Sequence, residues 1–218
     1  MTSILTNTAD IAQPWARHHL QKVLKPGMKA CILAMSDFDN VRNQEDWEKD
    51  YAPGGTWHGA YEKPLHSYGI REIVWLSPFK NSRFEMLQAI EETDLLVLPG
   101  GAPDLFMKRI RRFGLKKAIR SCQLLFGISA GAMIQLGDYH ITPDEDYAVF
   151  SWQTGLGLLP FDLECHFTGS RHQREYLDKA KEEKGLETWA LYEDGGLLVQ
   201  DGVVTAMGRV ERHAGNRD

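Results

Sequence analysis

Short, continuously apolar runs alternate along the chain with segments of helical spacing, and this alternation limits the possible folds more than any other feature. A strand buried on both faces reads as an unbroken apolar run, because helices cover both sides of a parallel sheet. The pattern therefore predicts an α/β fold, a three-layer sandwich with a mostly parallel central sheet. We expect its strands at Ile4–Thr6, Lys29–Met35, Arg71–Leu76, Asp94–Leu98 and Cys122–Phe126.

Helices are expected between these strands. Pro14–Leu24 and Pro103–Ile119 both have helical spacing, and each begins with proline, which suits the first turn of a helix. The segment Asp37–Tyr61 is rich in Asp, Asn, Trp and Gly and has no clean period. We interpret it as a long loop with one or two helical turns that borders an active site, as long loops in compact domains often do.

The last third of the chain has a different pattern. A strand is expected to end within Asp162–Phe167, and a charged helix is expected over Arg171–Lys184. Short strands follow at Trp189–Glu193, Gly196–Gln200 and Val203–Met207, with tight turns predicted at Asp194–Gly196 and Asp201–Gly202. Residues 211–218 form a polar tail that we expect to fray. At 218 residues, the whole chain is expected to form a single domain.

Composition excludes some classes of partner. The chain is 43% apolar and 25% charged, as is usual for a soluble protein, and its net charge of −5 argues against nucleic acid. No run is long enough to cross a membrane, and residues 1–20 do not look like a secretion signal. The three cysteines are an odd number without close pairing. We therefore expect a cytoplasmic protein, a monomer or homodimer, with no membrane or nucleic-acid partner.

A Gly-Ile-Ser-Ala-Gly-Ala motif at Gly127–Ala132 directly follows the apolar run that ends at Phe126. The Gly-x-Ser-x-Gly pattern is typical of a nucleophile elbow, a sharp strand-to-helix turn whose glycines allow neighbouring backbone to pass closely. The free N–H groups of the helix that follows can hold a developing oxyanion. The motif therefore predicts that Ser129 is a nucleophile.

A serine nucleophile needs a base within hydrogen-bonding reach, and that base needs an acceptor to orient it. Of the eight histidines, only His166 ends an apolar run, where side chains of an open α/β sheet face the ligand crevice. Glu193 also ends a predicted strand. From the residues alone, His166 is equally well read as a histidine held by a backbone carbonyl, and Glu193 as a turn carboxylate.

No cofactor is expected, and no metal. The chain lacks a close pair of His or Cys ligands beside a carboxylate at metal spacing. Cys165 and His166 are adjacent, and alternation along a strand would point them to opposite faces, so that only one of them faces Ser129.

Taken together, the motifs resemble the peptidase E (aspartyl dipeptidase) and cyanophycinase family of serine peptidases. The fold of that family is similar to class I glutamine amidotransferases, which are flavodoxin-like. The matching elements occur in the same order over roughly residues 4–207: Pro99–Ala102, the elbow Gly127–Ala132, His166-Phe167, Arg171-His172-Gln173-Arg174, and Glu193.

The resemblance implies a catalytic triad in which Ser129 is the nucleophile, His166 the base and Glu193 the orienting acid. It also implies that the N–H groups of Gly101 and Ala130 form the oxyanion hole. The expected activity is that of a serine exopeptidase acting on short peptides, a dipeptidase that favours N-terminal Asp.

Arg171 and Arg174 are candidate anchors for a substrate carboxylate, because a guanidinium binds a carboxylate bidentately. The alternative is that they lie on a solvated helix face. The chain also departs from the family: it has Ala102 where Asn is usual, Glu164-Cys165 where Asn-Pro is usual, and a shorter connection to the arginines. These departures leave the triad intact but bear directly on the preference for Asp.

An esterase and a non-enzymatic binding protein fit parts of the sequence, whereas a glutamine amidotransferase does not. An α/β-hydrolase esterase also carries Gly-x-Ser-x-Gly, but its order of Ser, acid and His would require His213 with Asp201. A glutamine amidotransferase would have cysteine at position 129. An amidotransferase-like protein with a vestigial site that binds a small ligand is the non-enzymatic alternative.

Overall fold

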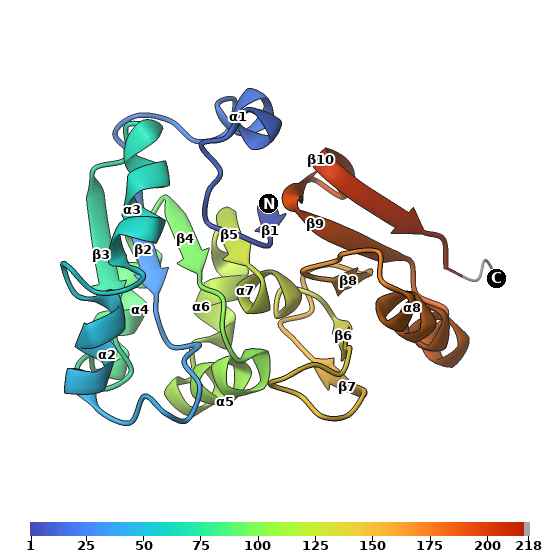
Figure 1. Cartoon of the computed structure of the whole chain (residues 1–218). Coiled ribbons are helices and arrows are strands. Elements are labelled where there is room, and N and C mark those ends of the chain that lie inside the picture. Colours follow the sequence, from blue (N-terminus) through green and yellow to red (C-terminus); the bar gives the residue numbers. More distant parts are fainter. Residues whose placement is uncertain (216–218) are drawn as a thin grey trace.

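An eight-stranded, mostly parallel sheet forms the centre of the computed structural model, which describes residues 1–215 (Figure 1). Seven strands follow the order β10-β9-β1-β5-β4-β2-β3, and β8 pairs with β9. The strands are β1 (Thr2–Thr6), β2 (Lys29–Leu33), β3 (Glu72–Leu76), β4 (Leu95–Leu98), β5 (Leu124–Ile128), β8 (Asp162–Glu164), β9 (Thr188–Gln200) and β10 (Val203–His213). The predicted α/β class with a mostly parallel sheet is confirmed.

The parallel strands β2, β4 and β5 are buried on both faces of the sheet, which explains their nearly continuous apolar sequence. On β5, Leu125 packs into one buried cluster and Leu124 into a second cluster on the opposite face. One cluster includes residues of α4 (Arg83–Glu91), α5 (Pro103–Phe113) and α6 (Lys116–Ser121). The other includes residues of α1 (Pro14–Leu20), α2 (Gln44–Tyr51) and α3 (His58–Ser67). The sheet is therefore the middle of three layers.

The segment Asp37–Tyr61 was expected to be mainly loop, but it contains α2 and the start of α3. The side chain of Asn43 caps α2 by accepting a hydrogen bond from the N–H of Asp46. Trp47 and Tyr51, one turn apart, are buried against the sheet, whereas most other side chains of α2 are charged. Two turns of helix with only two apolar anchors give too short a pattern to recognise in the sequence.

The predicted helix Pro103–Ile119 is divided into α5 and α6. Gly114 has a φ of 66° and ends α5 in the left-handed conformation that glycine adopts easily. A Cβ at this position would lie 3.2 Å from the Arg83 guanidinium, so the site has little room for a side chain.

The turn predicted at Asp194–Gly196 is wrong, because β9 continues through it as one long strand. The glycines instead allow the backbone of β10 to approach β9 closely: a Cβ at Gly195 would lie 1.9 Å from the carbonyl oxygen of Arg209 in β10. The predicted turn at Asp201–Gly202 does connect β9 to β10. Since β10 extends to His213, residues 211–213 of the expected frayed tail form strand; residues 216–218 lie outside the described residues.

Three elements beyond β5 complete the fold. They are the short helix α7 (Ala130–Met133), the antiparallel hairpin of β6 (Asp138–Ile141) and β7 (Ser151–Thr154), and the charged helix α8 (Arg171–Lys184). The hairpin was not anticipated. Within residues 1–215, no helix has the length and apolar character needed to cross a bilayer.

Candidate active site

Ser129 stands on a strained turn between β5 and α7. Its backbone has φ 47° and ψ −110°, a conformation that non-glycine residues rarely adopt and that is concentrated at functional sites. Its N–H donates a hydrogen bond to the carbonyl oxygen of Thr6, at 2.7 Å, which ties the turn to the end of β1. The turn thereby presents the Ser129 side chain at the carboxyl edge of the sheet.

The glycines of the elbow permit this geometry. A Cβ at Gly131 would lie 1.8 Å from the carbonyl oxygen of Leu98, and one at Gly127 would lie 2.3 Å from the carbonyl oxygen of Gly131. Real Cβ atoms do not approach backbone so closely. The short helix α7 is therefore packed directly against β4 and β5, as the sequence motif predicts.

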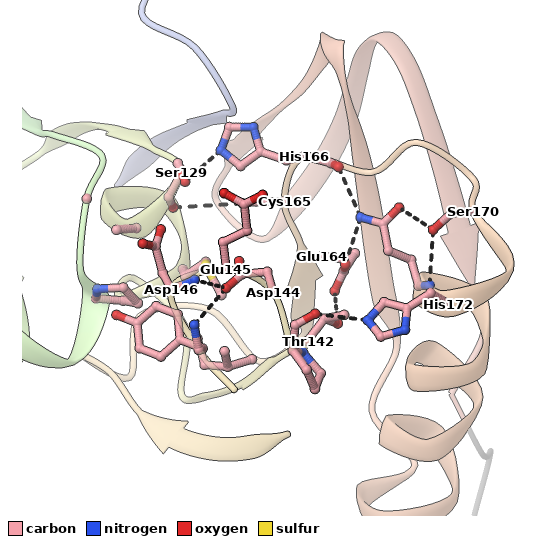
Figure 2. Close-up of a pocket in the computed structure, with 18 of the residues that line it drawn as sticks. Ser129, Thr142, Asp144, Glu145, Asp146, Glu164, Cys165, His166, Ser170 and His172 are labelled. Carbon is pink, nitrogen blue, oxygen red and sulfur yellow. Dashed lines mark hydrogen bonds between the residues drawn. The ribbon is translucent and has the colours of Figure 1, made fainter. Parts of the chain in front are cut away.

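His166 and Glu193 complete a hydrogen-bonded chain with Ser129. The Nε2 atom of His166 is 2.9 Å from Ser129 Oγ, and its Nδ1 atom is 2.5 Å from Glu193 Oε1 (Figure 2 shows the first contact). The side chains of His166 and Glu193 are 52% and 62% exposed, so the chain of hydrogen bonds is open to solvent. The structure thus brings together three residues that are far apart in the sequence.

His166 lies beyond the end of β8 and not within the strand, and its φ is 51°. The argument from strand alternation therefore fails: Cys165 and His166 both approach Ser129. The Cys165 thiol contacts the carbonyl oxygen of Ser129 at 3.8 Å, while the His166 ring reaches the hydroxyl. Burial raises the pKa of the Cys165 thiol well above its usual value, which keeps it neutral.

Two residues that were assigned no role from the sequence hold the backbone of His166. Its N–H donates to Asn7 Oδ1 at 3.0 Å, and the Asn7 amide donates to the carbonyl oxygen of Leu191 at 2.7 Å. The Gln173 amide donates to the carbonyl oxygen of His166 at 3.0 Å. The available signal for Asn7 was its position, since it directly follows β1 at the carboxyl edge of the sheet.

Gly101 and Ala130 line the same cavity as Ser129. Gly101 has a φ of 134°, and a Cβ there would lie 2.3 Å from the carbonyl oxygen of Ser36. The N–H of the next residue, Ala102, donates to that same oxygen at 2.7 Å. Neither the Gly101 nor the Ala130 N–H donates to a protein acceptor in the described part of the chain. Two unsatisfied donors beside a serine suit a developing oxyanion.

Two cavities meet at Ser129. The first, of about 740 Å³, is here called the hairpin cavity because Ile141–Tyr147 of the β6–β7 hairpin line it (Figure 2). The second, of about 950 Å³, is called the helix cavity because residues of α2 and α3 line it. Phe38, Gly101, Ser129 and His166 line both cavities, so a substrate bound at Ser129 can extend into each.

A buried histidine with two carboxylate partners lies behind the site. His140 Nδ1 is 2.5 Å from Asp162 Oδ2, and its Nε2 is 2.8 Å from Glu164 Oε2. Burial alone would lower the pKa of His140, but Asp162 and then Glu164 outweigh it and raise the pKa to about 10. Gln173 connects this cluster to the base, since its amide donates to Glu164 Oε1 at 3.1 Å and to the His166 carbonyl.

The two candidate carboxylate anchors point elsewhere. Arg171 is 92% exposed and pairs with Glu175 on its own helix, at 2.8 Å. Arg174 binds Glu211 of β10 through both terminal nitrogens, at 3.0 and 3.1 Å. Neither arginine is among the residues that line the hairpin or helix cavity, as far as residues 1–215 define them.

The residues that an esterase would need also lie apart. Asp201, in the turn between β9 and β10, pairs with the amino group of Met1 at 3.1 Å. His213 is at the other end of β10 and packs against Phe167. Among the described residues, no group of three or more His, Cys, Asp or Glu side chains is arranged to hold a metal ion.

Comparison with known proteins identifies the family. The profile of peptidase family S51 matches residues 58–207, more than half of the chain. The chain belongs to peptidase family S51. It is therefore a serine peptidase, a hydrolase of peptide bonds. The matched region contains the elbow, His166 and Glu193.

Two solved structures have the same fold as this chain. A peptidase E protein from Listeria monocytogenes EGD-e superposes with a TM-score of 0.68 at 18% identity, covering 95% of this chain and 98% of that one. A peptidase from an acI-B1 Actinobacterium gives 0.65 at 15% identity, covering 99% and 95%. At these identities the likeness establishes the fold. No curated protein matches the sequence significantly.

Proposed function

We propose that this S51 peptidase is an exopeptidase that hydrolyses short peptides, with a dipeptidase-like activity and a Ser129–His166–Glu193 triad. The observation that carries the proposal is the pair of hydrogen bonds that joins the three side chains, at 2.9 and 2.5 Å. A serine becomes nucleophilic when a base accepts its proton and a carboxylate orients that base.

In this mechanism, Ser129 Oγ attacks the peptide carbonyl carbon while His166 Nε2 takes the hydroxyl proton. Glu193 stabilises the imidazolium and fixes its tautomer. The N–H groups of Gly101 and Ala130 bind the negative oxygen of the tetrahedral intermediate, and each such donor is typically worth about 3 kcal/mol in the transition state. His166 then gives its proton to the leaving amine, and water hydrolyses the acyl-enzyme by the reverse proton transfers.

Preference for an N-terminal Asp requires a cationic partner for the substrate side chain. The ion pairs of Arg171 and Arg174 with Glu175 and Glu211 give these two arginines no role at the cavities. The proposal is therefore a short-peptide peptidase whose selectivity arises from residues other than this pair.

Labelling with a serine-directed fluorophosphonate tests the proposal, together with hydrolysis of a dipeptide library. Wild-type protein should incorporate the label and release free amino acids, whereas Ser129→Ala should do neither and should melt at nearly the same temperature. A wild-type protein that neither reacts with the label nor cleaves any peptide would identify the site as vestigial. If the Ser129→Ala variant still incorporates the label, the nucleophile is a residue other than Ser129.

A further inference from the structure

Asp37, in the helix cavity, is a buried acid with one oxygen left without a partner. The residue is 5% exposed and follows β2 at the carboxyl edge of the sheet. Its Oδ2 atom has no hydrogen-bond partner among the residues that the structure describes. A buried carboxylate oxygen without a donor is costly, and such groups usually have a partner that the protein alone does not provide.

The charge that lines this cavity is predominantly negative. Asp10, Asp37 and Asp50 line it, and Lys63 is the one lysine or arginine among residues 1–215 that does so. Arg109 is close to Asp37, but its guanidinium donates to the main-chain oxygens of Met35 and Asp37, at 2.9 and 2.6 Å. Arg109 therefore supports the backbone and leaves the carboxylate oxygen free to accept from a ligand.

The walls of the helix cavity are aromatic. Tyr51, Trp57 and Tyr61 line it, and Trp57 is 50% exposed. The Tyr61 hydroxyl accepts a hydrogen bond from the N–H of Gly100 at 3.2 Å, which fixes this wall beside the turn that precedes the oxyanion hole. Aromatic faces suit the aliphatic stem of a long basic side chain and attract its cationic head.

We propose that the helix cavity binds a cationic group of the peptide substrate and that Asp37 accepts its hydrogen bonds. The inference rests on the proposed peptidase function, because Ser129 lines the same cavity and places the cation beside the scissile bond. The cation is an ammonium or guanidinium, carried by a basic side chain or by the free amino terminus. Asp37 is a specificity-determining residue in this scheme, and the preferred substrate places a cationic group in the helix cavity.

The charged side chains that line the hairpin cavity are also mainly acidic, which favours a cationic substrate. Its lining includes Asp144, Glu145, Asp146 and Glu164, and no lysine or arginine of the described chain lines it (Figure 2). A substrate carboxylate would therefore face like charge on both sides of Ser129, which disfavours acidic peptides.

The test compares kcat/KM for Lys-Leu and Leu-Lys with their norleucine counterparts, for Asp-Leu, and for Nα-acetyl-norleucyl-Leu. A basic side chain in the cavity should favour a lysine peptide over its norleucine counterpart by about ten- to hundredfold, the range of one charge-assisted hydrogen bond. If the amino terminus is the cation, lysine and norleucine should be equal, and acetylation should cost a similar factor. Either preference should fall to nearly one in Asp37→Asn.

The matched control is Asp39→Asn, which removes the same charge from an exposed residue of the same loop that lines neither cavity. It should keep the wild-type ratios. Turnover with no preference for either cation, or a preference that survives in Asp37→Asn, overturns the inference while leaving the peptidase function standing.

Binding to the inactive Ser129→Ala variant separates this inference from the proposed function. Calorimetry should show tighter binding of lysinamide than norleucinamide, or of norleucinamide than its Nα-acetyl form, and the difference should disappear when Asp37→Asn is added. Equal affinities for all three ligands contradict a cation site at Asp37, whether or not the wild type hydrolyses peptides.

Discussion

At the scale of single residues, the elbow motif was enough to find Ser129, whereas the roles of His166 and Glu193 came from the family resemblance. Glu193 was expected to end a strand but lies inside β9. Asn7 and Asp37 could not be found in this way. Their importance lies in contacts between distant parts of the chain, such as that of Asn7 with His166, which are 159 positions apart, and no local sequence pattern records such contacts.

We expect Glu193→Gln to lower kcat by on the order of 10⁴-fold, as loss of the orienting carboxylate does in other triads. The amide cannot stabilise the imidazolium, and it favours the wrong tautomer. Asp194→Asn is the matched control, because that carboxylate is exposed and lies 3.8 Å from Arg209. Steady-state kinetics and melting curves of both variants check this; the reverse ranking would transfer the orienting role to Asp194.

A pH dependence follows from Asp37. Burial raises its pKa to about 6, against the lowering effects of the Tyr51 hydroxyl and Arg109. Asp50 and Tyr61 also face it, and burial raises the pKa of both tyrosines, so neither ionises near pH 6. A preference for cations should therefore strengthen as the pH rises through about 6 and Asp37 ionises. The ratio of kcat/KM for the preferred cationic peptide over its uncharged match, measured from pH 5 to 7.5, should rise in wild type and stay flat in Asp37→Asn.

At the scale of elements, the parallel strands were predictable and the elements around them less so. Continuous apolar runs identify β2, β4 and β5, because the side chains of these strands pack into the buried clusters on both faces of the sheet. The division of α5 from α6 and the continuity of β9 both depend on glycine. Gly114 ends a helix, whereas Gly195 lies inside a strand and allows close approach of β10, so the residue type alone does not distinguish the two cases. The β6–β7 hairpin was missed because β7 is partly exposed and therefore has no continuous apolar run in the sequence.

The cluster that joins β6 to β8 should make stability depend on pH. The folded-state pKa of His140, about 10, is above its ordinary value of 6.5, so its contribution is fully present below pH 6.5 and is lost as the pH rises toward 10. The free energy of unfolding from urea titrations should fall by up to about 1.4 kcal/mol per pH unit over this range.

Replacing His140 removes this slope and leaves Asp162 and Glu164 without their shared cation. His140→Gln should lower the free energy of unfolding at pH 6 by about 3–5 kcal/mol, the usual cost of breaking a buried ion pair. His18→Asn, on the exposed side of α1, is the control and should change neither value. If the free energy of unfolding depends on pH equally in wild type and in His140→Gln, then the proton on His140 does not contribute to stability.

At the scale of the whole molecule, β1 joins the two parts of the sheet. It pairs in parallel with β5 on one side and antiparallel with β9 on the other. Leu5→Ala, at a fully buried position of β1, should therefore lower the free energy of unfolding by about 2–5 kcal/mol and leave one cooperative transition. Tryptophan fluorescence and far-ultraviolet circular dichroism should give coincident urea curves; separate transitions would indicate two independent units.

The position of β1 also sets the order of events during synthesis. Thr2 pairs with Gln200, a residue that the ribosome adds much later. Such long-range pairing is slow and must wait for the late strand to emerge. Since β9 also carries Glu193, the nascent chain cannot assemble the proposed triad until this late strand has been synthesised. A peptidase that depends on such a triad stays inactive while its own unfolded segments, and those of neighbouring nascent chains, are exposed.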